Sequence, residues 1–234
     1  MVIYSDLPLG DALAEKLKGL KINFAFQPIF DRKTMEVIGH EALMRPLGCT
    51  PLQLIEEYRM VGGLHTLELA TFLGACKAYY DRGLKGMVSI NSFPSECFDE
   101  EESEAFFRCF PNIAKNMIVE ILEYTDLNFD KWVLKREQIH SHDIHIALDD
   151  YGSGTNCTMA VNIFEPDEIK VDRSLIRGIH QSPKMQDHFV KMVSSFHDKG
   201  VRVLAEGIEY KEELDFILTT DVDYLQGYYL GMPE

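Results

Sequence analysis

The sequence contains no segment with the length and composition needed to enter or cross a membrane. No run of about 18 consecutive apolar residues occurs. Residues 1–6 also lack the basic start and the apolar stretch of a signal peptide. We therefore expect a globular protein that stays in the cytoplasm.

Basic residues are scarce. The chain has 23 Lys and Arg against 38 Asp and Glu, which gives a formal net charge of -15. Proteins that bind nucleic-acid polymers rely on Lys and Arg to neutralise phosphates, so this composition argues against a broad nucleic-acid interface. An anionic substrate would need another source of positive charge, and bound divalent metal ions are the obvious one.

The cysteines form no recognisable pattern. Their number is odd and no C-x-x-C spacing occurs, which argues against both a disulfide framework and a zinc site. They are Cys49, Cys76, Cys97, Cys109 and Cys157. The histidines His140, His142 and His145 are closely spaced, but they span a predicted helix end and strand start, so we do not expect them to share one metal ion.

Several enzyme motifs are missing. Gly152-Ser153-Gly154 is not followed by the G-K-S/T of a phosphate-binding loop, and no G-x-S-x-G nucleophile elbow occurs. The serines and histidines form no recognisable nucleophile arrangement along the chain, although a triad assembled in space remains open.

Segments of strand type alternate with segments of helix type along the chain. The first strand is predicted at residues 23–30, and the second alternates over residues 36–40, carries Glu41 near its end and is closed by Pro46. The connection between them is too short for a helical crossover, so we expect an antiparallel hairpin. Further strands are predicted at residues 86–91, 116–121, 144–148, 168–171, 201–205 and 223–227. Helices are predicted at residues 11–20, 51–60, 64–81, 129–140, 185–199 and 212–218, with helical turns and a solvated acidic face at 94–110.

This alternation predicts an α/β fold with a parallel sheet covered on both faces. Seven strands after the first hairpin strand indicate closure into a barrel, with a doubly wound open sheet as the alternative. No linker, low-complexity segment or internal repeat interrupts residues 1–234, so we expect a single domain.

Polar side chains stand at or near the C-terminal ends of the predicted strands. They are Glu41, Asn91, Glu120, Asp149, Lys170, Glu206 and Gln226. The carboxyl ends of the strands form the face of an α/β barrel on which active sites are built. We therefore expect these side chains to share one site.

The expected site is rich in oxygen donors. Such donors suit Mg²⁺ or Mn²⁺ and not Zn²⁺, and the adjacent carboxylates of Asp149 and Asp150 are costly together without a cation. Two hard cations held by shared carboxylates are suited to in-line displacement at phosphorus. A salt-bridge cluster around Lys170 and Arg45 is the alternative, but two cations cannot balance five carboxylates.

These residues together resemble a known family, the EAL-domain phosphodiesterases, which hydrolyse the bacterial second messenger cyclic di-GMP to linear pGpG. The resemblance runs from about Phe26 to Pro233. The matching segments are Glu41-Ala42-Leu43 with Arg45, Asn91, Glu120-x-x-Glu123, Asp149-Asp150-Tyr151-Gly152-Ser153-Gly154, Lys170-Val171-Asp172, Glu206-Gly207-Ile208-Glu209 and Gln226-Gly227-Tyr228. The implied fold is a modified TIM (β/α)8-type barrel with one antiparallel strand near the N-terminus.

The resemblance also implies roles for the residues that carry the chemistry. The implied metal ligands are Glu41, Asn91, Glu120, Asp149 and Asp150. Lys170 would position the attacking water, Glu206 would be a ligand or the general base, and Asp150 would serve the second metal ion.

The remaining implied roles concern the substrate and the support of the site. Arg45 would contact a substrate phosphate, with Leu43 and Gln226 completing the substrate pocket. Glu123 would anchor the loop after Asp149 and Asp150, and Glu209 would support the site from behind.

The implied cofactor is Mg²⁺ or Mn²⁺, with two ions bound and Ca²⁺ as an inhibitor. The implied partners are cyclic di-GMP and a second copy of the chain in a homodimer, with sensor or GGDEF domains outside these residues. A catalytically silent cyclic di-GMP receptor is the main alternative, and a protein-interaction module is a third. Residues 155–159 depart from the family pattern in the loop that couples the site to dimerisation, which leaves that coupling open.

Overall fold

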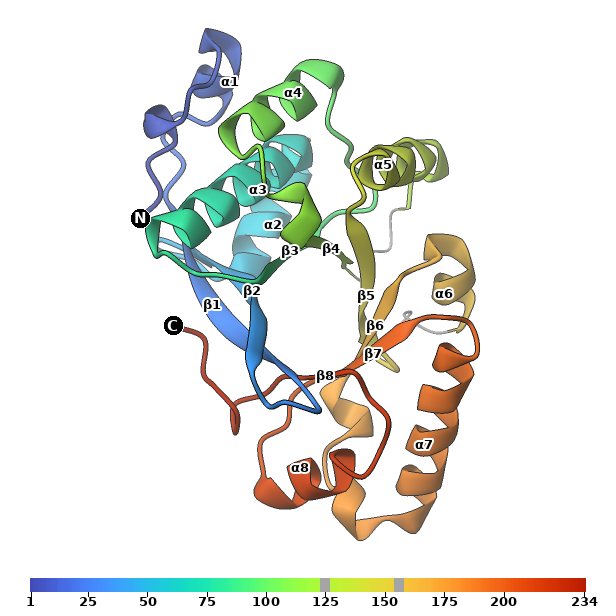
Figure 1. Ribbon diagram of the computed structural model, residues 1–234. Coiled ribbons are helices and arrows are strands. Elements are labelled where there is room, and N and C mark those ends of the chain that lie inside the picture. Colours follow the sequence, from blue (N-terminus) through green and yellow to red (C-terminus); the bar gives the residue numbers. More distant parts are fainter. Residues whose placement is uncertain (123–126, 154–157) are drawn as a thin grey trace.

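The computed structural model describes residues 1–122, 127–153 and 158–234, and its centre is a closed eight-stranded barrel with the helices outside it (Figure 1). The strands are β1 Ile22–Asp31, β2 Val37–Pro46, β3 Met87–Ser92, β4 Met117–Ile121, β5 His145–Tyr151, β6 Glu168–Val171, β7 Arg202–Ala205 and β8 Tyr224–Leu225. The helices are α1 Asp11–Lys16, α2 Pro51–Met60, α3 Leu64–Asp81, α4 Glu100–Cys109, α5 Phe129–Ser141, α6 Thr158–Phe164, α7 Pro183–His197 and α8 Lys211–Ile217. The predicted barrel is confirmed, and the open sheet is excluded.

Strand β1, the first strand of the hairpin, runs in the opposite direction to its neighbours in the barrel. β1 is antiparallel to both β2 and β8, whereas the other neighbouring strands are parallel. β2 runs on to Pro46, so Glu41 lies in the middle of the strand and not near its end as predicted. The parallel pairing of β2 with β3 stops at Ala42 and Ile90, however. Glu41 therefore still lies at the end of the parallel ladder, and only β1 accompanies β2 beyond it.

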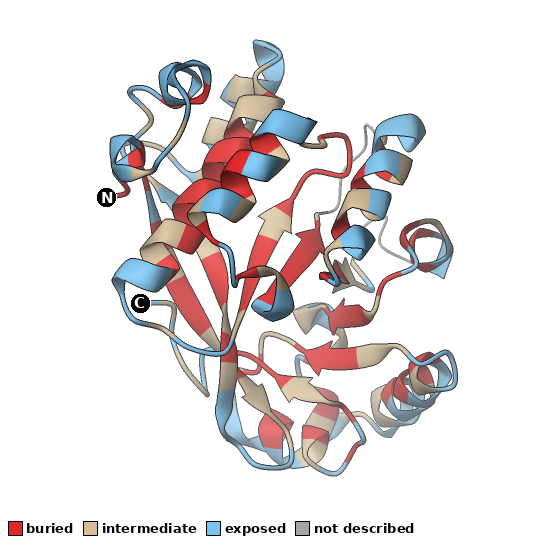
Figure 2. Cartoon of the chain, turned by 45° about the horizontal axis from the view of Figure 1, so that its top comes forward, coloured by how far each residue is buried: buried red, intermediate tan, exposed pale blue. Residues whose placement is uncertain are grey.

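Local sequence signals explain where several helices begin. Thr50 caps α2 through a hydrogen bond from the Gln53 backbone N–H, and Pro51 occupies the first turn, where its missing N–H costs nothing. Helix α3 carries a broad apolar surface, and it lies against the barrel with most of its residues buried (Figure 2). The bounds of both helices match the prediction.

The acidic segment of α4 differs from its prediction. Asp99 caps the helix in a reciprocal pair with Glu102, which fixes the start of α4. Glu102 is only 1% exposed, so the expected fully solvated face is wrong at this position. Its carboxylate accepts hydrogen bonds from Lys16 of α1 and is paired with His65 of α3, and these partners make its burial possible.

Two other helices departed from their predictions. Helix α1 ends at Lys16, four residues early, because a turn through Gly19 with φ +83° follows it. Helix α6 was not predicted at all. It is only seven residues long, too short for a clear helical period.

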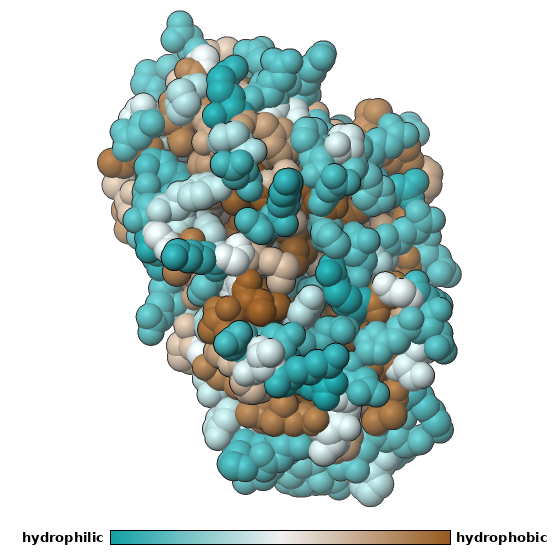
Figure 3. Space-filling model, in the orientation of Figure 1, coloured by the Kyte–Doolittle hydropathy of each residue, from teal (hydrophilic) through white to brown (hydrophobic). Residues whose placement is uncertain are grey.

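The face of the molecule seen in Figure 3 is mostly hydrophilic, with hydrophobic side chains in small separate groups. Among the described residues, no helix has both the length and the apolar character that a membrane span requires. The cysteines in the described part of the chain are unpaired thiols, and Cys157 lies outside the described residues.

Candidate metal and substrate site

Lys170 of β6 points into the barrel and is surrounded by carboxylates. Its Nζ lies 2.7 Å from Glu206 Oε1, 2.9 Å from Glu120 Oε1, 3.0 Å from Asp149 Oδ1 and 3.4 Å from Glu41 Oε2. The Lys170 side chain is only 1% exposed. The structure thus brings together side chains from five strand ends that the sequence had predicted to converge.

Amide and hydroxyl groups hold the carboxylates in place. Asn91 Nδ2 donates to Glu41 Oε1 at 3.3 Å, and Gln226 Nε2 donates to Glu41 Oε2 at 2.7 Å. On β3, Ser89 Oγ donates to Glu120 Oε1. The carboxylates of Glu41 and Glu120 therefore have a fixed orientation before any ligand arrives.

A bulge in β5 brings both neighbouring aspartates to the site. In a regular strand successive side chains point to opposite faces. The pairing of β5 with β6 shifts register between Leu148 and Tyr151, and Asp150 has φ +51°, a conformation that Asp tolerates better than most residues. One oxygen each from Asp149, Asp150 and Glu206 then lie within 4.8 Å of one another, close enough to hold one cation.

The pKa values of these groups reflect crowding of negative charge. Burial and the neighbouring Glu41 carboxylate raise the pKa of Glu120 well above its usual range. Burial also raises the pKa of Glu206 strongly. Burial and the adjacent Asp149 raise the pKa of Asp150 to about 6.

Two groups of the site remain charged. Burial opposes the charge on Lys170, but the surrounding carboxylates raise its pKa well above the usual value. Burial likewise opposes the charge on Glu41, but the Lys170 ammonium and the amides of Gln226 and Asn91 hold the pKa of Glu41 below its ordinary value. One ammonium cannot balance all the carboxylates, so in the absence of another cation some of them must take up protons.

Two buried oxygen atoms at the site fit a further cation. Glu120 Oε2 and Gln226 Oε1 are buried and have no hydrogen-bond partner among the described residues. Buried polar atoms are normally paired, and carboxylate and amide oxygens are the donors that Mg²⁺ and Mn²⁺ prefer. The residues present therefore fit a divalent metal.

A pocket opens beside this cluster. Of the residues predicted for the site, those that line it are Glu41, Asp150, Glu206, Glu209 and Gln226. Arg173 also lines this pocket, and its Nη2 is paired with Glu209 Oε2. Gly207 has φ +66°, and a Cβ there would lie 2.6 Å from Arg173 Cβ, so glycine is required for this contact.

The predicted substrate contacts are not all at the pocket. Arg45 is exposed, its Nη1 donates to the Met44 carbonyl at 2.9 Å, and it does not line the pocket. Strand alternation nevertheless places Leu43 and Arg45 on the same side of β2 as Glu41, beyond the end of the parallel ladder. No ion pair joins Glu41 to Arg45 in the described part of the chain. Glu123 lies outside the described residues.

The comparisons with known proteins agree with this geometry. Residues 11–233 match the model of the EAL domain. The chain belongs to the EAL domain family. Cyclic di-GMP phosphodiesterases are therefore the enzymes to which it is related.

Named relatives and solved structures extend this result. This EAL domain is 28% identical to the probable cyclic di-GMP phosphodiesterase PdeG of Escherichia coli K12, over 61% of this chain and 27% of that protein. A standalone EAL protein from Vibrio cholerae O395, in its cyclic di-GMP bound form, is 27% identical with a TM-score of 0.82, covering 92% of this chain and 93% of that one. BlrP1 of Klebsiella pneumoniae, in a manganese and cyclic di-GMP complex, is 24% identical with a TM-score of 0.76, covering 93% of this chain and 57% of that one. The chain spans 27–52% of the length of the first curated relatives.

Sequence reasoning missed Gln27, Ser89 and Arg173 of the EAL domain's site. It named Asp172 and Tyr228 within the matching segments but gave them no role. The period of two along β3 could have indicated Ser89, because it lies on the same face as Asn91. Gln27 could not be found in this way, because its place beside Glu41 depends on the register of the hairpin.

Proposed function

We propose that this EAL domain is an active, metal-dependent phosphodiesterase that hydrolyses cyclic di-GMP to linear 5'-pGpG. The observation that carries the proposal is the cluster of carboxylates around the single ammonium of Lys170. This excess of negative charge would repel a dianionic substrate unless cations occupy the site. The family membership and the cyclic di-GMP complexes of two structural neighbours support the choice of substrate.

The metal ligands in this proposal are the oxygen atoms of Glu41, Asn91, Glu120, Asp149 and Asp150. Asp149 would be shared between two ions, and Asp150 would serve the second. Divalent ions bound there would polarise the phosphoryl oxygen, lower the pKa of a water molecule and stabilise the leaving oxygen. Mg²⁺ or Mn²⁺ is the proposed cofactor because the ligand set contains oxygen alone.

Lys170 and Glu206 are proposed to handle the attacking water. Lys170 donates hydrogen bonds from the floor of the site and orients the water toward phosphorus. Glu206 lies 2.7 Å from the Lys170 Nζ, and its raised pKa suits a group that accepts the proton of the water, if it is not itself a metal ligand. Attack at phosphorus breaks the bond to O3', which leaves a 5'-phosphate and a free 3'-hydroxyl.

The substrate is proposed to lie across the pocket and the projecting end of β2. Gln226 orients Glu41 from below, while Arg45 and Leu43 contact the substrate from the extension of β2. Arg45 is exposed and would need only a side-chain rotation to reach a phosphate. Glu209, paired with Arg173, supports the pocket wall.

The test is a product assay with purified protein, cyclic di-GMP and Mn²⁺, followed by chromatographic separation of pGpG. Glu41→Ala and Glu206→Ala should each reduce turnover by at least about 100-fold, because each removes a group that acts on the reacting atoms. Glu41→Ala should also weaken Mn²⁺ binding. Exhaustive EDTA treatment should abolish turnover, and Mn²⁺ should restore it.

An exposed carboxylate that does not line the pocket provides the control. Glu56 is on α2, and its partner among the described residues is Arg59, so Glu56→Ala should keep the wild-type rate. Tight binding of cyclic di-GMP without any product would favour the silent receptor. Turnover that persists after metal removal would refute the metal-dependent mechanism.

Residues 1–234 are further proposed to form one EAL-type domain that associates as a homodimer. Size-exclusion chromatography with light scattering tests this assembly. A mass close to 27 kDa at micromolar concentration would contradict the dimer.

A further inference from the structure

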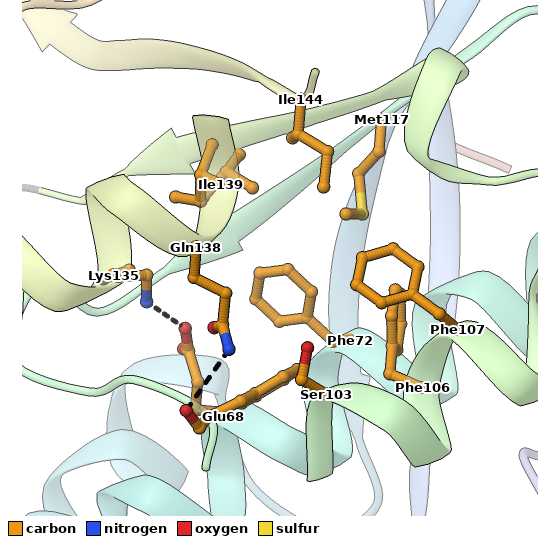
Figure 4. Close-up of a pocket in the computed structure, with 12 residues that line it drawn as sticks. Glu68, Phe72, Ser103, Phe106, Phe107, Met117, Lys135, Gln138, Ile139 and Ile144 are labelled. Carbon is orange, nitrogen blue, oxygen red and sulfur yellow. Dashed lines mark hydrogen bonds and ion pairs between the residues drawn. The ribbon is translucent and has the colours of Figure 1, made fainter. Parts of the chain in front are cut away.

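A buried ion pair lies behind the site, between α3 and α5. Lys135 of α5 points toward Glu68 of α3 (Figure 4), and its Nζ lies 2.5 Å from Glu68 Oε1. The two side chains are 6% and 1% exposed. An apolar pocket lined by Phe72, Phe106 and Phe107 adjoins the pair, so little water screens it.

Both members of the pair also bind the chain that follows β3. Glu68 accepts a hydrogen bond from Ser92 Oγ at 2.6 Å and another from the Phe93 backbone N–H at 3.1 Å. Lys135 Nζ donates to the carbonyl oxygens of Phe93 at 2.8 Å and of Glu96 at 2.7 Å. The buried segment 92–96 is thus held by side chains from two helices, which bind Ser92 Oγ and main-chain groups of the segment.

This segment begins directly after Asn91, whose own side chain is weakly held. Within the described part of the chain, the amide of Asn91 makes one hydrogen bond, 3.3 Å long, to Glu41. The position of Asn91 therefore depends chiefly on its backbone, which is fixed on one side by the pairing of β3 with β4 and on the other by Ser92 and Phe93. A shift of this backbone would move the amide oxygen away from the other proposed metal ligands.

Burial of an ion pair between α3 and α5 carries a desolvation penalty. Well-packed apolar residues of similar volume often stabilise a protein as much as a buried ion pair does. Apolar residues could not, however, bind Ser92 Oγ, the Phe93 amide and two carbonyls at once. In addition to filling space, the ion pair therefore fixes the position of the backbone at residues 92–96.

We propose that Glu68 and Lys135 are positioning residues, which fix residues 92–96 and through them hold Asn91 in the geometry needed to bind metal. This inference rests on the proposed function in one respect, the assignment of Asn91 as a metal ligand. It concerns residues that do not line the pocket beside the carboxylate cluster, and it can be tested by metal binding without turnover.

The central variant is Lys135→Met, which keeps a side chain of nearly the same length and removes its ammonium. We expect Mn²⁺ affinity, measured by calorimetry without substrate, to fall roughly 10-fold to 100-fold, the usual effect of removing a group that orients a ligand. The matched control is Trp132→Phe on the same helix, which removes part of a buried ring together with the hydrogen bond from Trp132 Nε1 to the Ile163 carbonyl. It should lower stability and leave Mn²⁺ affinity within about twofold, because the hydrogen bonds of Glu68 and Lys135 to segment 92–96 stay in place.

A double variant separates placement from charge balance. Lys135→Met combined with Glu68→Gln removes the uncompensated buried carboxylate, so the thermal midpoint should recover most of what the single variant loses. Mn²⁺ affinity should stay low, because the two carbonyls still lack their donor. Recovery of affinity together with stability would overturn the proposal, as would wild-type affinity in either variant.

Asn91→Ala distinguishes failure of this inference from failure of the proposed function. We expect it to weaken Mn²⁺ binding at least as much as Lys135→Met does. Unchanged affinity in Asn91→Ala would refute the ligand assignment and the positioning role with it. Weak binding in Asn91→Ala together with normal binding in Lys135→Met would refute the positioning role alone.

Discussion

Lys170 is surrounded by more carboxylates than one ammonium can balance. Three of the carboxylates that contact its Nζ, those of Glu41, Glu120 and Asp149, are also proposed to bind metal, so the ammonium partly competes with the cations it accompanies. Its retention in the site is explained if it acts on the reaction itself. Binding and turnover should therefore respond in opposite directions when it is removed.

Lys170→Met is the variant that tests this separation. We expect turnover of cyclic di-GMP to fall by roughly 100-fold or more, since a group that orients the nucleophile is lost. Mn²⁺ affinity should rise or stay equal, because the competing positive charge is gone. A titration of Mn²⁺ and a product assay measure the two quantities, and a clear loss of Mn²⁺ affinity would contradict the competition.

Glu168 lies two residues before Lys170 on the same strand and is also buried. Its Oε2 has no hydrogen-bond partner among the described residues, and the nearest guanidinium nitrogen, of Arg202, is 3.8 Å away. Burial raises the pKa of Glu168 from the ordinary 4.5 to about 7. The folded protein therefore holds a proton that the unfolded chain gives up between these two pH values.

Because the pKa of Glu168 is higher in the folded protein than in the unfolded chain, the free energy of unfolding falls as the pH rises. A carboxyl whose pKa is raised by folding costs nothing below about pH 4.5, and its ionisation destabilises the folded state progressively as the pH rises to about 7. Over this range the free energy of unfolding of the wild type falls by roughly 3 kcal/mol. Glu168→Gln has no carboxyl to ionise, so its stability relative to wild type should increase by that amount between pH 4.5 and pH 8. Urea unfolding of both proteins at the two pH values measures it, and a constant difference would contradict the shift.

At the scale of helices and strands, the sequence predicts the bounds of those elements that have a regular pattern of apolar residues. Helix α3 and strand β6 have the predicted bounds, because an apolar surface of constant period and clear flanking residues define them. The bulge at Asp149 and Asp150 was not predictable, since it depends on how β5 meets β6. The resemblance therefore placed both aspartates at the site, but the sequence did not predict the bulge that lets both of them reach it.

The same distinction applies to charged side chains. The sequence could not show that Arg45 turns toward its own backbone or that Glu102 is buried, because both depend on the neighbouring elements. Glu102 connects three helices, through Lys16 of α1 and His65 of α3. This cluster fixes α4 against α1 and α3.

The attachment of α4 should weaken in alkaline solution. Hydrogen bonds to Glu102 and Glu96 raise the pKa of His65 from 6.5 to about 9, so its stabilising charge is fully present below pH 6.5 and is lost as the pH rises through 9. After allowance for partial exposure, we expect a loss of roughly 1–2 kcal/mol over this range. Thermal unfolding of wild type and His65→Gln between pH 6.5 and pH 10 measures the difference, which should disappear at the alkaline end.

At the scale of the whole molecule, the carboxylates of the site and the net charge of -15 both add electrostatic repulsion to the folded state. The carboxylates at the end of the barrel repel one another as well as the rest of the acidic surface, and the strands that carry them close the barrel. A cation that binds there relieves this repulsion only in the folded state, because the ligands come from separate strands. Metal binding should therefore stabilise the whole fold.

Thermal unfolding in EDTA and in Mn²⁺ tests this coupling. At a free Mn²⁺ concentration about 100 times the dissociation constant, binding adds roughly 2.7 kcal/mol, which corresponds to about 5–10 °C in the thermal midpoint of a domain of this size. Glu41→Ala should lose most of this increase, while Glu56→Ala on the surface should keep it. Ca²⁺ should also raise the midpoint and yet inhibit hydrolysis, because it tolerates looser geometry and activates water less well. An equal increase in the Glu41→Ala variant would show that the stabilising ion binds elsewhere on this acidic molecule.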